Sequence, residues 1–343
     1  MSASDQLRDL SIIRQILLQR LIAGENRRLN RQLNDIAKEL ERQIKSGKPL
    51  TTFQGNRLEK AIQELAAIVN LDTPDLREFA QLEAQYVTNS LATVSVQSAL
   101  PPAATLAKIA DSSLVQGATI SDWFTRLGET MRFEINRAVK LGISLGETNE
   151  QIARRIVGAA GTKGSEVIPR GRRDALAIVR TAVQTVSNDA RNQTYLANQD
   201  VIKGVQWISV LDSRTTEICM ARAGKVWSLP DYTPVDHSIP WNGGPPAHWS
   251  CRSTTIPVLK TWREMGVDMD ELPASTRASL NGQVAADITF DEFLRRQPAG
   301  FADEMLGKGK AELWRSGRIT LSQLLNAEGR PITLNELRRR YGG

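Results

Sequence analysis

Three side chains able to bind a metal or act as nucleophiles fall in two short stretches of this 343-residue chain. Cys219 lies in the first stretch, and His248 and Cys251 lie in the second, separated by two residues. This spacing lets the imidazole and the thiol face one point, where Cys219 can complete a set of three zinc ligands. The sequence does not single out a fourth ligand, since Asp212, His237 or water would each serve.

Other interpretations of the two cysteines remain open. A disulfide between Cys219 and Cys251 is expected if the protein matures in an oxidising environment. Two reduced thiols packed in a core, beside a hydrogen-bonded structural His248, are ordinary in proteins. A catalytic Cys–His pair is a further alternative, although the sequence reveals no acidic partner that would orient the imidazole.

The residues around these three ligands form a longer pattern. It consists of Asp212-x-Arg214-Thr215, then Cys219 and Gly224, then Pro245-Pro246-x-His248-x-x-Cys251-Arg252-Ser253. This pattern resembles the signature of the phage head-morphogenesis family, the Mu-type minor head proteins of tailed phages. Many members carry a second Cys shortly after the first, whereas this chain has Met220-Ala221-Arg222 there. The departure weakens the case for a four-ligand zinc site.

The resemblance extends on both sides of the signature. The similar segments are Val179-Arg180-Thr181-Ala182, Asn188-x-x-Arg191-Asn192, Asn281-Gly282-Gln283, Leu306-Gly307 and Thr333-Leu334-Asn335-Glu336-Leu337. It therefore covers the chain from about Ser121 to the C-terminus. It implies a virion protein present in few copies at the portal vertex, which acts in head assembly and genome delivery. The implied partners are the portal protein, a capsid or scaffolding protein, and phage DNA.

An enzyme acting on nucleic acid or protein is the competing class, with Asp212, Arg214, His248 and Arg252 as its active groups. The chain has only two histidines and contains no Gly-x-Ser-x-Gly or His-Glu-x-x-His motif, so few groups could support acid–base catalysis. We therefore favour a structural virion protein without catalytic residues. In it, Asp212, Arg214 and Arg252 would tie loops together, because guanidinium groups bind carboxylates and carbonyls in a fixed geometry.

Composition limits the setting of the protein. The net charge of +6 is compatible with proximity to nucleic acid but is modest for a dedicated DNA-packing protein. No apolar run approaches the length of a membrane span. The N-terminus lacks the basic start and apolar stretch of a secretion signal, so we expect synthesis in the host cytoplasm and a final place in the virion.

Aliphatic spacing predicts helix from Ser4 to about Ser46. One stripe contains Leu7, Leu10, Ile13, Leu17 and Leu21, and a second contains Leu29, Leu33, Ile36, Leu40 and Ile44. Gly24 lies between the stripes, so the segment is one bent helix or two. Further helices are expected over 58–71 and from the N-cap residue Thr73 to about Asn89. We expect residues 1–100 to form an arm that binds partner subunits.

The remaining elements should position the signature. A helix capped by Ser121, another opened by the Thr148/Gln151 capping box, and a third over 172–198 precede a strand over 201–210, which delivers Asp212 to a turn. A further strand is expected at 225–227. Capping boxes at Thr289/Glu292, Thr320/Gln323 and Thr333/Glu336 predict short helices that must pack on the body, because they are too short to be stable alone.

These elements predict an α+β fold that is mainly α. Its expected parts are an N-terminal helical arm (1–100), a helical body (101–200), a small β-containing module with the Cys/His signature (201–260), and a region of short C-terminal helices (261–343).

Overall fold

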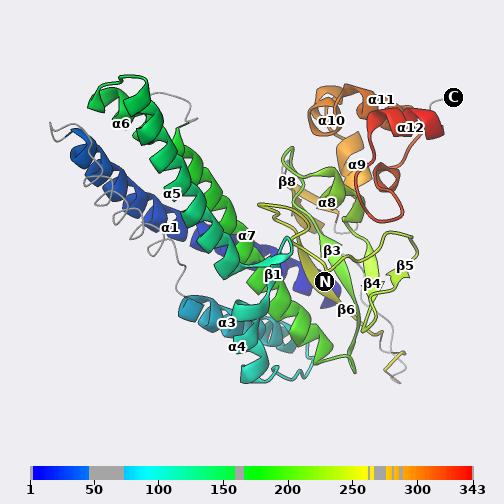
Figure 1. Ribbon diagram of the computed structural model, residues 1–343. Coiled ribbons are helices and arrows are strands. Elements are labelled where there is room, and N and C mark those ends of the chain that lie inside the picture. Colours follow the sequence, from blue (N-terminus) through cyan, green and yellow to red (C-terminus); the bar gives the residue numbers. More distant parts are fainter. Residues whose placement is uncertain are drawn as a thin grey trace. The chain divides into compact units, whose positions relative to one another are not determined.

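The computed structural model describes residues 3–45, 73–158, 166–261, 263–265, 276–279, 282–285 and 289–341. Helices predominate among them, with small antiparallel sheets, and the expected α+β, mainly α fold is confirmed (Figure 1). The helix expected over 58–71 lies outside the described residues, as does Asn281 of the Asn281-Gly282-Gln283 segment. No helix in the described ranges combines the length and apolar character needed to cross a membrane.

The chain divides into two compact units, each assembled from separate segments. Unit 1 contains Met1–Ile16, Ala80–Leu106 and Ser187–Gly343, and unit 2 contains Leu17–Phe79 and Ala107–Val186. The boundaries of these units differ from those of the expected parts, which are 1–100, 101–200, 201–260 and 261–343. The reason is that α1 (Ala3–Lys45), α3 (Thr73–Thr93), α4 (Ala103–Ser112) and α7 (Val167–Leu196) each contribute residues to both units.

The N-terminal segment is one helix, α1, which continues through Gly24. The second predicted stripe is buried at Leu29, Leu33, Leu40 and Ile44. Of the first stripe, Leu7 is buried, whereas Ile13, Leu17 and Leu21 are 52%, 42% and 43% exposed, and the aliphatic residues buried in this part of the helix are Leu18 and Ile22. An uninterrupted helix keeps one buried face, and the helical repeat carries that face from Leu29 back to Ile22 and Leu18.

In unit 2, α5 (Ile120–Ser144) and α6 (Asn149–Val157) begin with capping boxes. The box predicted at Thr148 and Gln151 is confirmed. The cap of α5 is Thr119 rather than Ser121: its hydroxyl accepts a hydrogen bond from the Asp122 N–H, while the Asp122 carboxylate accepts one from the Thr119 N–H. Thr119 is the cap residue because Asp122, three positions later, completes the reciprocal pair of hydrogen bonds. A two-stranded sheet, β1 (Leu114–Val115) with β2 (Ala118–Thr119), precedes α5.

Unit 1 is built around a four-stranded antiparallel sheet with the order β5-β4-β3-β6. The strands are β3 (Ile202–Ile208), β4 (Val226–Ser228), β5 (Pro234–Val235) and β6 (Thr254–Leu259). The strands predicted over 201–210 and 225–227 are confirmed as β3 and β4. A Cβ atom on Gly204 would lie 2.6 Å from the Trp227 carbonyl oxygen, so a glycine is needed where β3 passes β4. A separate two-stranded sheet pairs β7 (Thr276–Ser279) with β8 (Gly282–Ala285).

The core on this sheet includes parts of the N-terminal 100 residues. Leu7 of α1 and Leu91 of α3 are buried in the same cluster as Trp207, Cys219 and Cys251. Removing residues 1–100 would therefore take side chains out of the core of unit 1. This packing corrects the expectation that 1–100 is an arm separate from the folded body.

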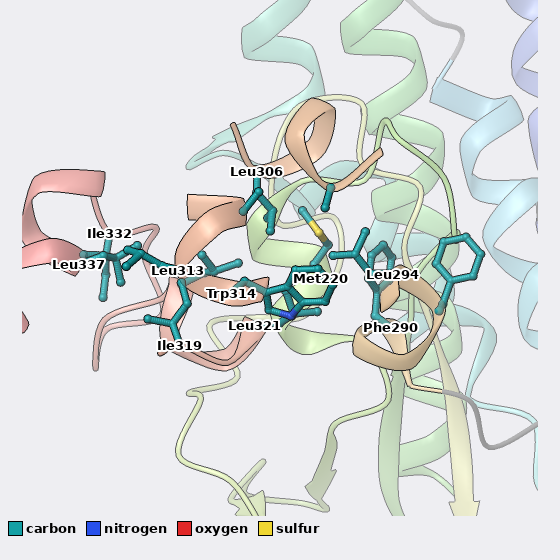
Figure 2. Packing of buried hydrophobic residues seen from close by; sticks show 14 of the residues in the cluster. Met220, Phe290, Leu294, Leu306, Leu313, Trp314, Ile319, Leu321, Ile332 and Leu337 are labelled. Atoms are coloured by element: carbon teal, nitrogen blue, oxygen red, sulfur yellow. The ribbon is translucent and has the colours of Figure 1, made fainter. Parts of the chain in front are cut away.

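The C-terminal helices gather around a second core of unit 1. They are α9 (Phe290–Arg295), α10 (Ala299–Leu306), α11 (Lys308–Arg315), the 3-10 helix η1 (Leu321–Leu324) and α12 (Leu334–Tyr341). Figure 2 shows Met220, from α8 (Glu217–Arg222), reaching into this core beside Trp314 and Leu294. The short helices thus pack on α8, the helix that carries Cys219. This packing was expected, because helices of this length are not stable alone.

Candidate metal centre and its supporting network

Two elements of unit 1 carry the candidate ligands. Cys219 is the third residue of α8, and His248 and Cys251 lie in the loop that leads into β6. In this loop the Cys251 N–H donates to the His248 carbonyl oxygen at 3.2 Å. The resulting turn holds the imidazole and the thiol on the same side of the loop, where they meet the sulfur from α8.

The structure brings these three side chains together. The Cys219 sulfur lies 3.2 Å from His248 Nε2 and 3.5 Å from the Cys251 sulfur, and all three donor atoms lie within 4.8 Å of one another. The sulfurs are far outside the roughly 2.05 Å of a disulfide, and both cysteines are free. Tetrahedral zinc would separate two sulfurs by about 3.8 Å and a sulfur from a nitrogen by about 3.6 Å. The donor set therefore fits such an ion after shifts of a few tenths of an ångström.

The His248 ring is oriented as a ligand. Its Nδ1 lies 2.9 Å from the Trp249 carbonyl oxygen, which can only accept, so Nδ1 carries the proton and donates it. Nε2 then keeps its lone pair and faces the Cys219 sulfur. A backbone carbonyl that fixes the tautomer in this way is the usual outer partner of a metal-binding His.

The pKa values of the two thiols are shifted in opposite directions. The hydrogen bond with Cys251, together with burial, raises the pKa of Cys219 well above its ordinary value. The hydrogen bond with Cys219 lowers the pKa of Cys251 well below its ordinary value against the effect of burial, and His248 lowers it further. Burial acts to lower the pKa of His248, but its contact with Cys251 raises it overall. The cluster thus favours a thiolate on Cys251, the form that binds metal.

The two side chains considered as a fourth ligand, Asp212 and His237, are occupied by other contacts. His237 Nε2 donates to the Val226 carbonyl oxygen at 2.8 Å, and its Nδ1 accepts from the Ile239 N–H at 3.1 Å, so neither nitrogen is available. Asp212 is engaged by Arg252. Within the described part of the chain, no other His, Cys, Asp or Glu joins the three-residue group.

Asp212, Arg214 and Arg252 form one contact group beside the cluster. Both Nη atoms of Arg252 lie 2.6 Å from the Asp212 carboxylate, one to each oxygen. The Arg214 N–H donates to Asp212 at 3.0 Å, whereas the Arg214 guanidinium is 77% exposed and reaches Asp212 only at 3.4 Å. Arg252 therefore makes the stronger contact, and Arg214 contributes mainly through its backbone.

A third arginine, Arg222 of α8, was not singled out from the sequence. Its side chain is buried and donates to the carbonyl oxygens of Ile218, Pro240 and Gly329 at 3.4 to 3.5 Å. Burial lowers the pKa of Arg222. It links three segments of unit 1, a role expected for Arg214 or Arg252. The available signal was its place in Met220-Ala221-Arg222, the stretch where the sequence departs from the pattern that it resembles.

A buried ion pair ties α3 to α7. Arg191 Nε donates to Glu83 at 2.7 Å, and these side chains are 1% and 0% exposed. Arg14 of α1 reaches the other oxygen of the same carboxylate at 2.8 Å. Arg191 was part of the sequence resemblance, but Glu83 and Arg14 were not recognised, because neither stands near it in the sequence.

Two asparagines beside Arg191 also hold the signature module. Asn188 accepts a hydrogen bond from the Thr254 hydroxyl at 2.9 Å, and Asn192 accepts one from the Tyr232 hydroxyl at 2.7 Å. Asn188, Arg191 and Asn192 thus each reach a different segment of unit 1, which gives the Asn-x-x-Arg-Asn spacing a structural role.

Of three comparisons with known proteins, one found a match. No curated protein matches the chain. Likewise, no solved structure matches it. The model of one family, described as "Phage Mu protein F like protein", matches residues 133–256, a narrower span than the resemblance from Ser121 to the C-terminus. The matched span holds all three candidate ligands, Asp212 and Arg252. The resemblance is therefore confirmed over residues 133–256, which match the model of a phage head-morphogenesis family.

Proposed function

We propose that this chain is a structural minor head protein of a tailed phage that acts in head morphogenesis at the portal vertex and in genome delivery. The observation that carries the proposal is the family match over residues 133–256, which includes the Cys/His cluster. The supporting contacts are of a structural kind: the buried pair with Glu83 fixes Arg191, Arg222 binds backbone carbonyl oxygens, and a tryptophan-rich core surrounds the two cysteines.

The alternative function is a metal-dependent or Cys/His enzyme acting on nucleic acid or protein. The 3.2 Å approach of Cys219 to His248 Nε2 is the observation in its favour. However, a nucleophile must reach its substrate, and the residues Cys219 and Cys251 are 2% and 0% exposed. The His248 Nδ1 meets a carbonyl oxygen rather than a carboxylate that would stabilise an imidazolium. These features favour a structural cluster.

We further propose that Cys219, His248 and Cys251 bind zinc, with water as the fourth ligand. Two thiolates and an imidazole are a donor set that zinc prefers. The ion would join α8 to the loop before β6 and so clamp the two halves of the signature. A structural metal contributes its binding free energy to folding, which suits a module with short strands and long loops.

The proposed partners are the portal protein, a capsid or scaffolding protein, and phage DNA. On α1, Ile13, Ile16, Leu17 and Leu21 are 42% to 52% exposed, and aliphatic side chains at this helical spacing are usually covered in an assembly. The chain carries a net charge of +6, which favours a place near DNA. The protein would be made in the host cytoplasm and would reside in the virion.

Purified particles test this proposal. Quantitative mass spectrometry should find the chain in mature heads at a small fraction of the major capsid protein, and cross-linking should join it to the portal. Leu17→Asp, on the exposed face of α1, should reduce incorporation without lowering the melting temperature. The matched change Lys38→Asp, also exposed on α1, should leave incorporation unchanged. Absence of the chain from both procapsids and mature heads would contradict the proposal.

A further inference from the structure

Helix α5 carries two regular stripes of side chains on opposite faces. The first is buried in unit 2 and follows spacings of four and three residues, through Phe124, Gly128, Met131, Ile135, Ala138 and Gly142. The second, the outer α5 stripe, begins two positions after Met131, which is a turn of about 200° around a helix. It consists of Phe133, Asn136, Lys140 and Ile143. Spacings that alternate between three and four residues are the pattern by which one helix packs along another.

The outer α5 stripe has an exposed apolar residue at each end. Phe133 is 64% exposed and Ile143 is 50% exposed. An open hollow of about 660 Å³ along this face is lined by Phe133, Asn136 and Lys140 together with neighbouring residues of α5. Apolar side chains that gather on one exposed face mark a surface that a partner covers.

The residue types along the outer α5 stripe read the same in both directions: apolar, polar, polar, apolar. Two antiparallel copies of α5, centred on position 138, would place Phe133 of each copy opposite Ile143 of the other. The same alignment would place Asn136 opposite Lys140, and the asparagine carbonyl oxygen can accept a hydrogen bond from the lysine ammonium group. A two-fold axis requires this reciprocity, in which residue i meets residue j and j meets i.

The charges beside the stripe favour a second copy over an acidic partner. Arg137 lies nearest the axis of such a pair, and its guanidinium is 2.7 Å from the Glu134 carboxylate of its own chain. This ion pair weakens the repulsion between the two Arg137 side chains. Glu134 also lies 3.4 Å from Arg170, so the flank of the stripe contains both charges and is not a basic surface.

We propose that two copies of this chain associate through antiparallel pairing of their α5 helices along the outer α5 stripe. The stripe is about 15 Å long. Because it has only two apolar positions in each copy, we expect a weak dimer, with a dissociation constant of about 1 to 100 μM. None of its four residues belongs to the Cys/His cluster or to the exposed face of α1, so the proposal does not depend on the roles assigned to those two sites.

Sedimentation velocity of the full-length chain measures this association over a range of concentrations. Phe133→Asp should weaken it at least about tenfold, because a charge replaces the largest apolar side chain of the interface. The matched control is Leu114→Asp, in β1 of the same unit, where the leucine is 60% exposed; it should stay within about twofold of wild type. Far-UV circular dichroism of each variant serves as the folding control.

A charge exchange tests the alignment of the two helices. Asn136→Lys places two lysines opposite each other in both central layers and should weaken association at least about tenfold. Adding Lys140→Asp creates a lysine–aspartate pair in each of these layers and should restore association to within about threefold of wild type. The restoration requires that position 136 of one copy faces position 140 of the other.

Three results would overturn the proposal. The first is a wild-type chain that remains monomeric at about 100 μM. The second is a dimer that Phe133→Asp leaves unchanged, which would place the interface elsewhere. The third is a double variant that stays as weak as Asn136→Lys, which would contradict the alignment. If wild type is monomeric and Phe133→Asp still prevents incorporation into heads, the face binds a different protein rather than a second copy.

Discussion

Arg252 holds Asp212 in a two-pronged ion pair, with each Nη atom 2.6 Å from a different carboxylate oxygen. The two side chains are 18% and 15% exposed, so solvent screens the pair only in part. Arg252 directly follows Cys251, and Asp212 lies in the turn between β3 and α8. The pair therefore fastens the loop that carries His248 and Cys251 to the turn that leads into Cys219.

Replacement of Arg252 by Lys should destabilise the protein by about 1 to 3 kcal/mol, because a single ammonium cannot bind both carboxylate oxygens in this geometry. Chemical denaturation measures the change. The control is Arg214→Lys, since the Arg214 side chain is 77% exposed; it should change stability by no more than about 0.5 kcal/mol. Equal losses for the two substitutions would contradict the role assigned to Arg252.

The same pair predicts a pH dependence. Burial acts to raise the pKa of Asp212, but the Arg252 hydrogen bonds and charge lower it overall. A carboxyl whose pKa is lower in the folded than in the unfolded state stabilises the fold above its unfolded pKa of about 3.9, and this contribution is lost as pH falls through the folded pKa. The stability difference between wild type and Asp212→Asn should be constant from pH 7 to about 5 and shrink below about pH 4. A difference that stays unchanged down to pH 3 would count against the ion pair.

Breaking the ion pair between Glu83 and Arg191 should destabilise the protein more than breaking the pair between Asp212 and Arg252. Glu83→Gln leaves a guanidinium that is 1% exposed without its carboxylate, and we expect a loss of about 3 to 5 kcal/mol. Glu78→Gln is the matched control, because Glu78 lies exposed on the same helix; its effect should stay within about 0.5 kcal/mol. Thermal unfolding of both variants tests this prediction, and a Glu83→Gln protein as stable as its control would refute it.

The sequence was informative where the chemistry is local. The Thr148/Gln151 box was predictable because both partners lie within one helical turn. Cys219, His248 and Cys251 could be selected because they are rare residue types in a short pattern, and the structure brings them together. The strand before Asp212 followed from its run of β-prone residues.

Long-range pairing could not be predicted in this way. Glu83 neutralises Arg191 across more than one hundred residues, and no periodicity in the sequence marks that contact. The stripe with Ile13 and Leu17 has spacings of three and four residues, which fit two adjacent helix faces, and only the packing of α1 decides which face is buried within the chain.

The metal content of the full-length chain is the most direct test of the proposed cluster. The protein is purified under reducing conditions without added metal, and zinc is measured by inductively coupled plasma mass spectrometry. We expect roughly one zinc ion per chain in wild type and in His237→Gln, and almost none in His248→Gln. The two substitutions are matched, because the chain has only two histidines and the His237 nitrogens are occupied by backbone groups. Wild-type protein without zinc, with both thiols free or joined in a disulfide, would contradict the account.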